Sequence, residues 1–448
     1  MLIAVWRKPM HLREYANATP YMGYSYSYPH KSAYRQLEPR SLREVWADEA
    51  HDQLFLYLHI PFCEMRCGFC NLFTTTNPNE SVVQRYLATL ELQMQALHNE
   101  LGAVQFSRMA IGGGTPTYLS ASELEQLFSM SQRWLGVNSR AIPLSVETSP
   151  HTATADRMAI LAQAGVDRVS IGVQSFLDHE AHAAGRAQRR PEVEQALATV
   201  RAAQIPTLNI DLIYGLPNQS VATWLESLEI GLQWRPEELY LYPLYVRPLT
   251  GLDRRGTGWE HDLRLECYRA GRERLLAAGY QQISMRMFRA AHAPDDSQAP
   301  RYCCQTDGML GLGAGARSYT RKLHYSSDYA VGASSVRQII QNYNQRSLLD
   351  LSQVDYGCVV SSTEQRRRFV IQSLLQVSGL DTQAYRAQFG SDVLADLSQI
   401  NELIEIGWAE YQHGIYQLTP AGLERSDLIG PWLYSPQIRQ LSAEFILR

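Results

Sequence analysis

Residues 54–278 alternate six times between a short apolar run and an amphipathic segment. The runs are too apolar to leave a solvated face, so they predict buried strands at 54–60, 109–111, 142–147, 168–173, 207–213 and 239–245. The segments between them have apolar residues at helical spacing and predict helices at 80–101, 120–135, 153–164, 191–203, 220–233 and 260–278. This alternation predicts an α/β fold with a parallel sheet covered by helices, as an open doubly wound sheet or a barrel.

Polar or thiol-bearing positions stand at or just after the ends of these predicted strands. They are Cys63, Gly112, Glu147, Gln174 and Asp211. Proteins with a βα barrel keep their functional groups at the carboxyl ends of the strands, so this placement favours the barrel. Six units are fewer than a closed barrel of this type has, and we therefore expect an open six-unit (βα)6 partial TIM barrel.

Cys63, Cys67 and Cys70 follow the first predicted strand in a C-x3-C-x2-C spacing. Thiolates select soft metals, above all zinc and iron–sulfur clusters. A structural zinc site closes all four ligand positions, whereas three thiols suit a [4Fe–4S] cluster with one iron left for a small molecule. A zinc site completed by a distant His or Cys is the alternative. Phe69 favours the cluster, because an apolar wall beside Cys70 would shield it from water.

Other residues near the strand ends are candidates for binding that small molecule. The glycines at 112–114 would let a ligand approach the backbone amides, although a tight βα turn explains them as well. Glu147, Gln174 and Asp211 would bond a ribose or an amino group, or simply cap their strands. Arg186 would pair a carboxylate in bidentate fashion, or lie on the surface beside two further arginines. The glycine-rich stretch 311–315 lacks dinucleotide-binding spacing and predicts close backbone packing.

The chain divides into four predicted regions: an N-terminal extension at 1–50, the barrel core at 51–255, a barrel-completing region with the glycine-rich turn at 256–358, and a C-terminal domain at 359–448. The C-terminal pattern predicts helices at 364–377 and 393–406, with a short one between them, then a hairpin with strands at 408–411 and 415–418 and a last helix. This outline is typical of a winged helix. The tyrosine-rich stretch 21–30 predicts a segment packed over a domain edge, with a lid over a substrate pocket as the alternative.

Charge and cysteine usage restrict the partners and the compartment. The chain has 448 residues, with 41 Lys+Arg against 45 Asp+Glu and a net charge of −4, which argues against nucleic acid or an anionic membrane as the main partner. No apolar run approaches the ~18 residues of a membrane span, and we expect no secretory signal. Seven cysteines, four of them scattered, indicate a reducing, cytoplasmic setting.

Five motifs taken together resemble the oxygen-independent coproporphyrinogen III oxidase family of radical SAM enzymes. This family includes the HemN oxidases, the HemW haem chaperones and related methyltransferases. The motifs are His59-Ile-Pro-Phe-Cys-x3-Cys-x2-Cys70, Gly112-Gly-Gly-Thr-Pro116, Gly172-Val-Gln-Ser-Phe176, Asp211-Leu-Ile-Tyr-Gly-Leu-Pro217 and Gly311-Leu-Gly-Ala-Gly-Ala316. The resemblance extends from about residue 50 to about residue 430.

The resemblance implies a radical SAM partial barrel followed by a HemN-type C-terminal domain. It implies a [4Fe–4S] cluster on Cys63, Cys67 and Cys70, with S-adenosylmethionine on the remaining iron. The residues that it places around S-adenosylmethionine are Tyr57, Phe69, Gly113, Gly114, Thr115, Glu147, Gln174, Arg186 and Asp211. Arg186 would pair the methionine carboxylate, Gln174 and Asp211 the ribose, and Phe69 would flank the adenine.

Two positions depart from the best-known branches of this family. HemN-type oxidases carry an extra cysteine two residues after the third ligand, where this chain has Leu72, and the H-N-x-x-Y-W motif of HemW is absent at 299–304. We therefore expect a radical SAM oxidoreductase with an unassigned small-molecule substrate, a tetrapyrrole being the candidate class, and a reductant such as flavodoxin or ferredoxin. A haem chaperone, a HemN-like methyltransferase and a zinc-stabilised binding protein are the alternatives.

Overall fold

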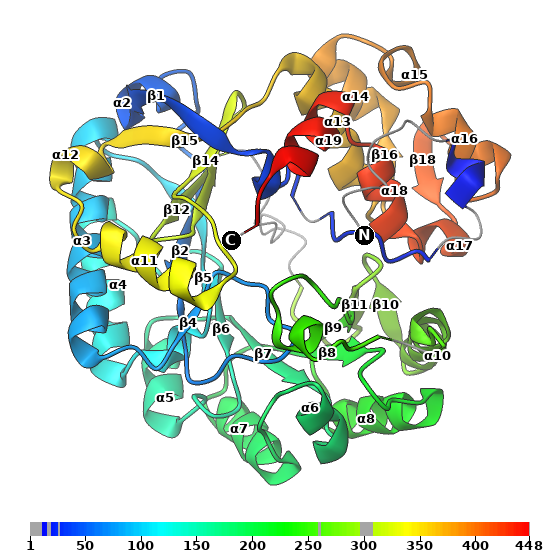
Figure 1. Ribbon diagram of the computed structural model, residues 1–448, viewed down its shortest axis with the longest axis horizontal. Helices are drawn as coiled ribbons and strands as arrows, with labels where there is room; N and C mark the ends of the chain where they lie inside the picture. The colour runs from blue at the N-terminus through cyan, green and yellow to red at the C-terminus, as the bar shows by residue number, and fades with distance from the viewer. Residues whose placement is uncertain (1–10, 16–18, 26, 259–260, 296–307, 448) are drawn as a thin grey trace.

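The computed structural model describes residues 11–15, 19–25, 27–258, 261–295 and 308–447. Its centre is a 13-stranded sheet curved into an open barrel with helices outside (Figure 1). The six predicted strands are present and pair in parallel in chain order. They are β2 (Leu54–Ile60), β5 (Phe106–Gly113), β6 (Leu144–Thr148), β7 (Arg168–Gln174), β8 (Thr207–Tyr214) and β9 (Glu238–Pro243). The structure thus confirms the partial barrel.

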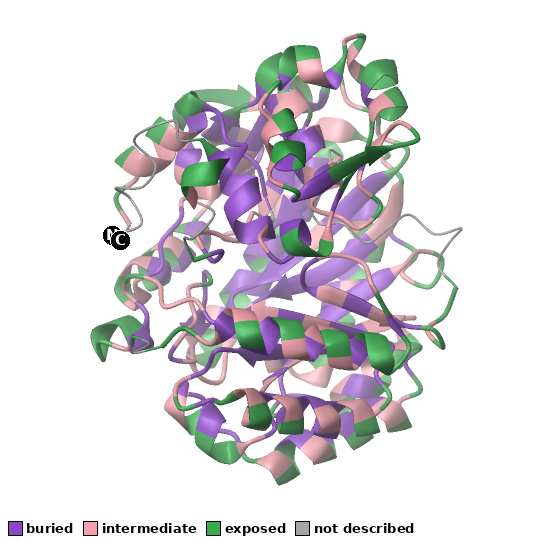
Figure 2. Ribbon diagram, turned by 90° about the vertical axis from the view of Figure 1, so that its right-hand side faces the viewer, coloured by how far each residue is buried: buried purple, intermediate pink, exposed green. Residues whose placement is uncertain are grey.

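The helices that cover the barrel also follow the prediction within a few residues. They are α3 (Glu80–Leu101), α4 (Ala121–Leu135), α5 (Ala155–Gln163), α7 (Arg190–Ala202), α8 (Val221–Gln233) and α10 (Arg264–Ala277), with the short α6 (Asp178–Ala183) and α9 (Gly251–Arg254) between them. The helix predicted from residue 260 begins only at Arg264. Figure 2 shows that helices on the outside of the sheet are buried on one side and exposed on the other, as amphipathic segments are expected to be.

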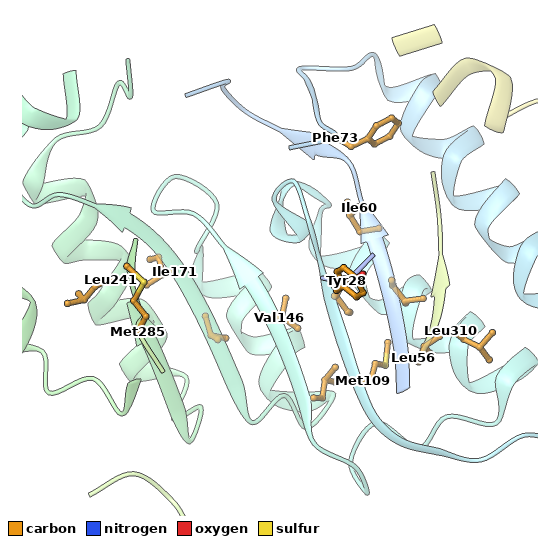
Figure 3. Close-up of a cluster of buried hydrophobic side chains, with 14 of the residues drawn as sticks. Tyr28, Leu56, Ile60, Phe73, Met109, Val146, Ile171, Leu241, Met285 and Leu310 are labelled. Atoms are coloured by element: carbon orange, nitrogen blue, oxygen red, sulfur yellow. The ribbon is translucent and has the colours of Figure 1, made fainter. Parts of the chain in front are cut away.

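The prediction that the strands are too apolar to leave a solvated face is wrong on the inner side of the barrel, where Glu147 is exposed and Arg168 and Asp211 are half-buried. On β2, Leu56 and Ile60 point to the helical layer and belong to the main hydrophobic core (Figure 3). Val146, Ile171 and Leu241 do the same on β6, β7 and β9. Because side chains alternate along a strand, the residues between them face the barrel interior. Those residues are largely polar: Ser145, Glu147, Arg168, Ser170, Asn209, Asp211 and Glu238.

The sheet continues beyond both ends of the six-strand core. Next to β2 lies the parallel β12 (Met309–Leu312), followed by the antiparallel β13 (Arg317–Tyr319), β14 (Leu323–Ser326), β15 (Gln353–Val359) and β1 (Arg35–Ser41). Next to β9 lie the antiparallel β11 (Met287–Ala290) and β10 (Tyr280–Gln282). Outside this half lie α2 (Leu42–Trp46), α11 (Ala333–Tyr343) and α12 (Leu348–Leu351). The edges β1 and β10 do not pair, so the barrel stays open there.

The glycine-rich turn between β12 and β13 is a site of close backbone packing, as predicted. A Cβ atom on Gly311 would lie 2.1 Å from the carbonyl oxygen of Arg317. Gly313 has a φ of +100°, and a Cβ there would lie 2.6 Å from the carbonyl oxygen of His59. A side chain at either position would push β12 away from β2 or β13.

The C-terminal domain fits the predicted winged-helix-like outline except at one helix. It contains α13 (Ser362–Leu374), β16 (Leu380–Asp381), α14 (Thr382–Phe389), α15 (Val393–Asp396), α16 (Ile400–Glu405), β17 (Ala409–Gln412), β18 (Ile415–Leu418), α17 (Pro420–Leu423), α18 (Ser426–Trp432) and α19 (Pro436–Glu444). The helix predicted at 393–406 is broken at Leu397, which leaves the helical conformation with φ −141° and ψ 63° and buries its side chain. His413 and Gly414 have positive φ angles, as a tight hairpin turn requires.

The described part of the chain contains no helix that combines the length and the apolarity needed to cross a bilayer. The arginine run 366–368 does not form a basic surface. Arg366 pairs with Asp396 at 3.1 Å, Arg367 donates to the carbonyl oxygen of Leu433 at 2.8 Å, and Arg368 is buried. These arginines stabilise the C-terminal domain internally.

Candidate functional site

The three clustered cysteines lie at the mouth of the barrel, directly after β2. Cys63 ends the short strand β3 (Phe62–Cys63), which pairs in parallel with β4 (Thr75–Thr76). Cys67 and Cys70 lie on the loop between β3 and β4, where the amide of Cys70 donates to the carbonyl oxygen of Cys67 at 3.1 Å. All three thiols are free and half-buried. We call residues 63–76 the Cys loop.

The Cys loop is held in place by a contact of three glycines that the sequence analysis did not identify. Gly68 donates to the carbonyl oxygen of Ala184 at 3.0 Å and accepts from the amide of Leu252 at 2.7 Å. Cβ atoms on Gly185 and Gly251 would lie 3.0 and 3.1 Å from the Cα atom of Gly68. The signal in the sequence was the glycine between Cys67 and Cys70. The sequence analysis considered only the spacing of the cysteines there and assigned this glycine no role.

The predicted glycine loop packs directly on the first cysteine. The amide of Gly114 donates to the carbonyl oxygen of Ile60 at 2.9 Å, and a Cβ on Gly114 would lie 3.0 Å from Cys63 Sγ. Thr115 Oγ1 donates to Cys63 Sγ at 3.5 Å. Gly113, with φ +114°, donates its amide to Glu147 Oε2 at 3.0 Å. The structure thus brings Gly113, Gly114 and Thr115 to the Cys loop, and the predicted tight turn is present.

Arg186 reaches the Cys loop from the opposite side. Its Nη1 donates to Cys67 Sγ at 3.1 Å, and its Nη2 donates to the carbonyl oxygen of Gly172, on β7, at 2.6 Å. The alternative of a surface arginine is therefore wrong, because only 8% of Arg186 is exposed. Arg189 and Arg190 do lie at the surface, where they pair with Glu192 and Glu194.

Glu147, Gln174 and Asp211 occupy neighbouring strands of the barrel on its inner face. Burial raises the pKa of Glu147 to about 7, and the charge of Asp211 adds to the rise. By accessible surface Glu147 is nevertheless exposed, because the interior of the barrel is open to solvent at this residue. Burial also raises the pKa of Asp211 to about 6, although Asn209 Nδ2 donates to it at 2.7 Å and Ser170 Oγ at 3.2 Å. Gln174 ends β7 with a φ of +72°.

The two predicted aromatic residues lie on opposite sides of the mouth. Tyr57 faces inward from β2 and packs against Phe55, Ala110 and Tyr319. Phe69 packs near the ends of β8 and β9 with Leu216, Leu244 and Leu252.

His59 is a residue at this site to which we assigned no role from sequence. Its ring lies 3.4 Å from the hydroxyl of Tyr57 and 3.3 Å from the carbonyl oxygen of Phe73. Burial lowers the pKa of His59 to about 4, so the ring is neutral at pH 7. A Cβ on Gly113 would lie 2.5 Å from this ring, so His59 and Gly113 fit together. The position of His59 near the end of the first predicted strand, four residues before Cys63, was the signal that could have identified it.

The donor chemistry fits an iron–sulfur cluster better than a single metal ion. Within the described ranges, no three His, Cys, Asp or Glu side chains converge closely enough to bind one ion. The thiols of a cluster each bind a different iron, so they do not need to converge. Burial raises the pKa of Cys63 to about 12 and also raises that of Cys70, so binding of iron would release protons from these thiols.

Comparison with known proteins agrees with this geometry. Residues 57–230 match the radical SAM superfamily, and residues 360–424 match the HemN C-terminal domain. The chain is 30% identical over 361 residues to an oxygen-independent coproporphyrinogen III oxidase of Pseudomonas aeruginosa, covering 77% of this chain and 76% of the relative. It is 31% identical over 271 residues to the heme chaperone HemW of Bacillus subtilis, covering 59% of this chain and 70% of the relative.

The solved structure of coproporphyrinogen III oxidase (HemN) from Escherichia coli has the same fold. It matches with a TM-score of 0.72 and 23% identity over 89% of this chain and 91% of that one. The relatives divide between oxidases and chaperones, so they establish a family and leave the reaction open. This chain belongs to the HemN-like family of radical SAM proteins.

Proposed function

We propose that the protein is a radical SAM oxidoreductase that binds a [4Fe–4S] cluster through Cys63, Cys67 and Cys70. The observation that supports it best is the convergence of two independent groups on this loop. Thr115, in the loop after β5, donates to the first thiol, and Arg186, in the loop after α6, donates to the second. When bound, the cluster supplies an electron that cleaves S-adenosylmethionine to methionine and a 5′-deoxyadenosyl radical.

The residues around the Cys loop would bind and orient S-adenosylmethionine. In this proposal Gly113, Gly114 and Thr115 contact its methionine part. Arg186 pairs the methionine carboxylate through N–H groups that do not already donate to protein atoms. Asp211 and Gln174 bond the ribose. Glu147 shares this side of the barrel with them. The aromatic residues Tyr57 and Phe69 exclude water on the two sides, with Phe69 against the adenine.

The substrate in this proposal is a tetrapyrrole, and the reaction resembles that of a coproporphyrinogen dehydrogenase. The support is the similarity to the oxidases over most of both chains, together with the shared fold. A cytoplasmic flavodoxin or ferredoxin would supply the electron. Leu72, half-exposed beside Cys70, occupies the position of the extra cysteine of HemN-type oxidases. We therefore place this protein in a branch of the family separate from the HemN-type oxidases, with its exact reaction unassigned.

A haem chaperone is the second candidate, because several of the similar relatives are HemW proteins. The stretch 299–304, where the HemW motif is missing from the sequence, lies outside the described residues. A HemN-like methyltransferase is a further alternative within the same fold.

Reductive cleavage of S-adenosylmethionine separates the enzyme from the chaperone. The full chain is reconstituted anaerobically with iron and sulfide, reduced with dithionite and assayed for 5′-deoxyadenosine. We expect product from the wild type and from a Cys267→Ala control, whose buried cysteine lies outside the Cys loop, and none from Cys67→Ala. Stoichiometric haem binding without 5′-deoxyadenosine would instead support the chaperone.

A further inference from the structure

Gln188 lies beside Arg186 in the short connection between α6 and α7. The side chain is buried, with only 6% of the residue exposed. The amide of Gln188 donates to the carbonyl oxygen of Arg186 at 3.0 Å, which closes a tight turn. In the other direction, Arg186 Nε donates to Gln188 Oε1. The glutamine therefore contacts the arginine through both its backbone and its side chain.

The orientation of the Gln188 amide is determined by the end of β7. Gln188 Nε2 donates to the carbonyl oxygen of Val173 at 2.7 Å and to that of Ser175 at 3.1 Å. A carbonyl oxygen can only accept, so the NH2 group has to face these two atoms. The amide oxygen is then the atom that faces Arg186, where it accepts from Nε. The hydrogen bonds thus assign the nitrogen and the oxygen of this amide.

The two carbonyl groups that Gln188 bonds flank Gln174, one of the residues proposed to bond the ribose. Gln174 has a φ of +72°, a left-handed conformation that residues other than glycine rarely adopt. Gln188 bonds the residue before Gln174 and the residue after it, so it stabilises this bend at the end of β7. A single amide group thus holds both the backbone around Gln174 and the side chain of Arg186.

The guanidinium of Arg186 is held at three points. Besides the bond from Nε to Gln188, Nη1 donates to Cys67 Sγ at 3.1 Å and Nη2 to the carbonyl oxygen of Gly172 at 2.6 Å. These bonds use the Nε–H and one N–H on each terminal nitrogen, which leaves a second N–H on each for a carboxylate. Because the guanidinium is planar and rigid, an acceptor that fixes the direction of the Nε–H also fixes the directions of the other N–H groups.

We propose that Gln188 is a positioning residue that fixes the plane of the Arg186 guanidinium, so that Arg186 donates to Cys67 and keeps N–H groups available for the carboxylate of S-adenosylmethionine. This inference rests on the proposed function. Gln188 does not ligate the cluster and acts through Arg186. Without the acceptor at Nε, the long arginine side chain would regain rotamer freedom, and its contact with the thiol would be made only part of the time.

The reduction potential of the reconstituted cluster tests this role. An N–H group that donates to a cluster thiolate stabilises the reduced state, so a weaker contact from Arg186 lowers the potential. Gln188→Met keeps the length of the side chain but has no amide oxygen to accept from Arg186. We expect it to lower the midpoint potential, measured by redox titration with electron paramagnetic resonance, and to weaken S-adenosylmethionine binding about tenfold. Gln195→Met, at an exposed position on α7, is the matched control and should change neither quantity.

Removal of Arg186 separates a positioning role from a structural one. If Gln188 acts through Arg186, then adding Gln188→Met to Arg186→Met should change the potential no further. A purely structural glutamine would affect the melting temperature and the iron content but leave the potential of Gln188→Met at the wild-type value. Gln188→Asn is a milder variant, because it keeps an amide that is one methylene shorter. It should lower the potential by less, and it replaces Gln188→Met if that variant does not fold.

A folded Gln188→Met variant with the wild-type potential and the wild-type affinity for S-adenosylmethionine would overturn the inference. An equal shift of the potential with and without Arg186 would also overturn it, because Gln188 would then act by another route. The wild-type samples are assayed in parallel for iron content and 5′-deoxyadenosine. A wild type that forms product while Gln188→Met keeps its potential contradicts this inference alone, whereas a wild type that binds no cluster contradicts the proposed function.

Discussion

Arg186 connects a cysteine thiol to a strand end, so its replacement should change the electronic properties of a bound cluster. An N–H group that donates to a cluster thiolate stabilises the reduced, more negative state and raises the reduction potential. The 3.1 Å contact with Cys67 Sγ is of this kind. The guanidinium also fixes where the Cys loop meets β7, through the carbonyl oxygen of Gly172.

We predict that Arg186→Lys lowers the midpoint potential of the reconstituted cluster and weakens S-adenosylmethionine binding about tenfold, because lysine cannot reproduce the planar fork. Redox titration followed by electron paramagnetic resonance measures the potential. Arg189→Lys is the control, since Arg189 lies at the surface with Glu192. An unchanged potential in Arg186→Lys would mean that the N–H···S contact does not persist in the loaded protein.

Glu147 should make the stability of the folded chain depend on pH. Its pKa is raised from an ordinary carboxyl value to about 7. The folded state therefore binds more protons than the unfolded state between about pH 4.5 and 7, and stability falls as the pH rises through this range. The Glu147→Gln variant should lose less stability than the wild type as the pH rises, and it should be the more stable of the two at pH 8. Urea unfolding at a series of pH values, with the surface variant Glu125→Gln as control, measures the effect.

At the scale of elements, the site depends on loops that approach each other at backbone distance. A Cβ on Gly68 would lie 2.6 Å from the carbonyl oxygen of Ala184, an atom that cannot move without α6. The Cys loop, the end of α6 and the start of α9 therefore have one compatible arrangement. This arrangement sets the positions of Cys67 and Cys70, which flank Gly68.

We predict that Gly68→Ala displaces the Cys loop and lowers the affinity for the cluster about tenfold, as is usual when a supporting contact of a metal ligand is lost. Iron content per chain after reconstitution and desalting measures this loss. Gly258→Ala is the matched control, because a Cβ there meets no atom within 4 Å. If Gly68→Ala keeps the full iron content, the Cys loop can shift without losing affinity for the cluster, which would contradict this prediction.

The elements and the cysteine site could be predicted from sequence because local patterns specify them. The period and length of the hydrophobic pattern define the strands and helices. The spacing of Cys63, Cys67 and Cys70 is likewise a local feature of the sequence. The polar inner face was not predicted because Glu147 and Asp211 have apolar neighbours in the sequence. Their strands therefore resemble continuous apolar runs. The role of Gly68 could not be inferred, since it depends on contacts with residues far away in the sequence.

At the scale of the whole molecule, the tyrosine-rich stretch 21–30 and the C-terminal domain meet beside β11, near one open edge of the sheet. Arg286, just before β11, forms a buried ion pair with Asp427 on α18, and the hydroxyl of Tyr245 donates to the same carboxylate. The guanidinium of Arg286 also lies 3.8 Å from the ring centre of Tyr24. The tyrosine-rich stretch thus packs over a domain edge, as its favoured interpretation predicted.

We predict that Asp427→Asn destabilises the protein by about 3–5 kcal/mol, because it leaves Arg286 buried without its counter-charge. Replacing both partners together, as Arg286→Met with Asp427→Leu, should cost less than the single change. Denaturant unfolding measures both variants. Asp48→Asn, which breaks the surface pair with Lys322, should leave the stability nearly unchanged. A double variant as unstable as Asp427→Asn would contradict this account.

The pairing of β1 with β15 has a consequence for how the chain matures on the ribosome. Residues 35–41 are synthesised early, but their partner strand, 353–359, emerges near the end of translation. The parallel strands β2 to β9 are complete long before that, with all three thiols already in place. A nascent chain therefore completes the strands that carry the Cys loop before β1 can pair, so β1 joins a barrel that is already formed.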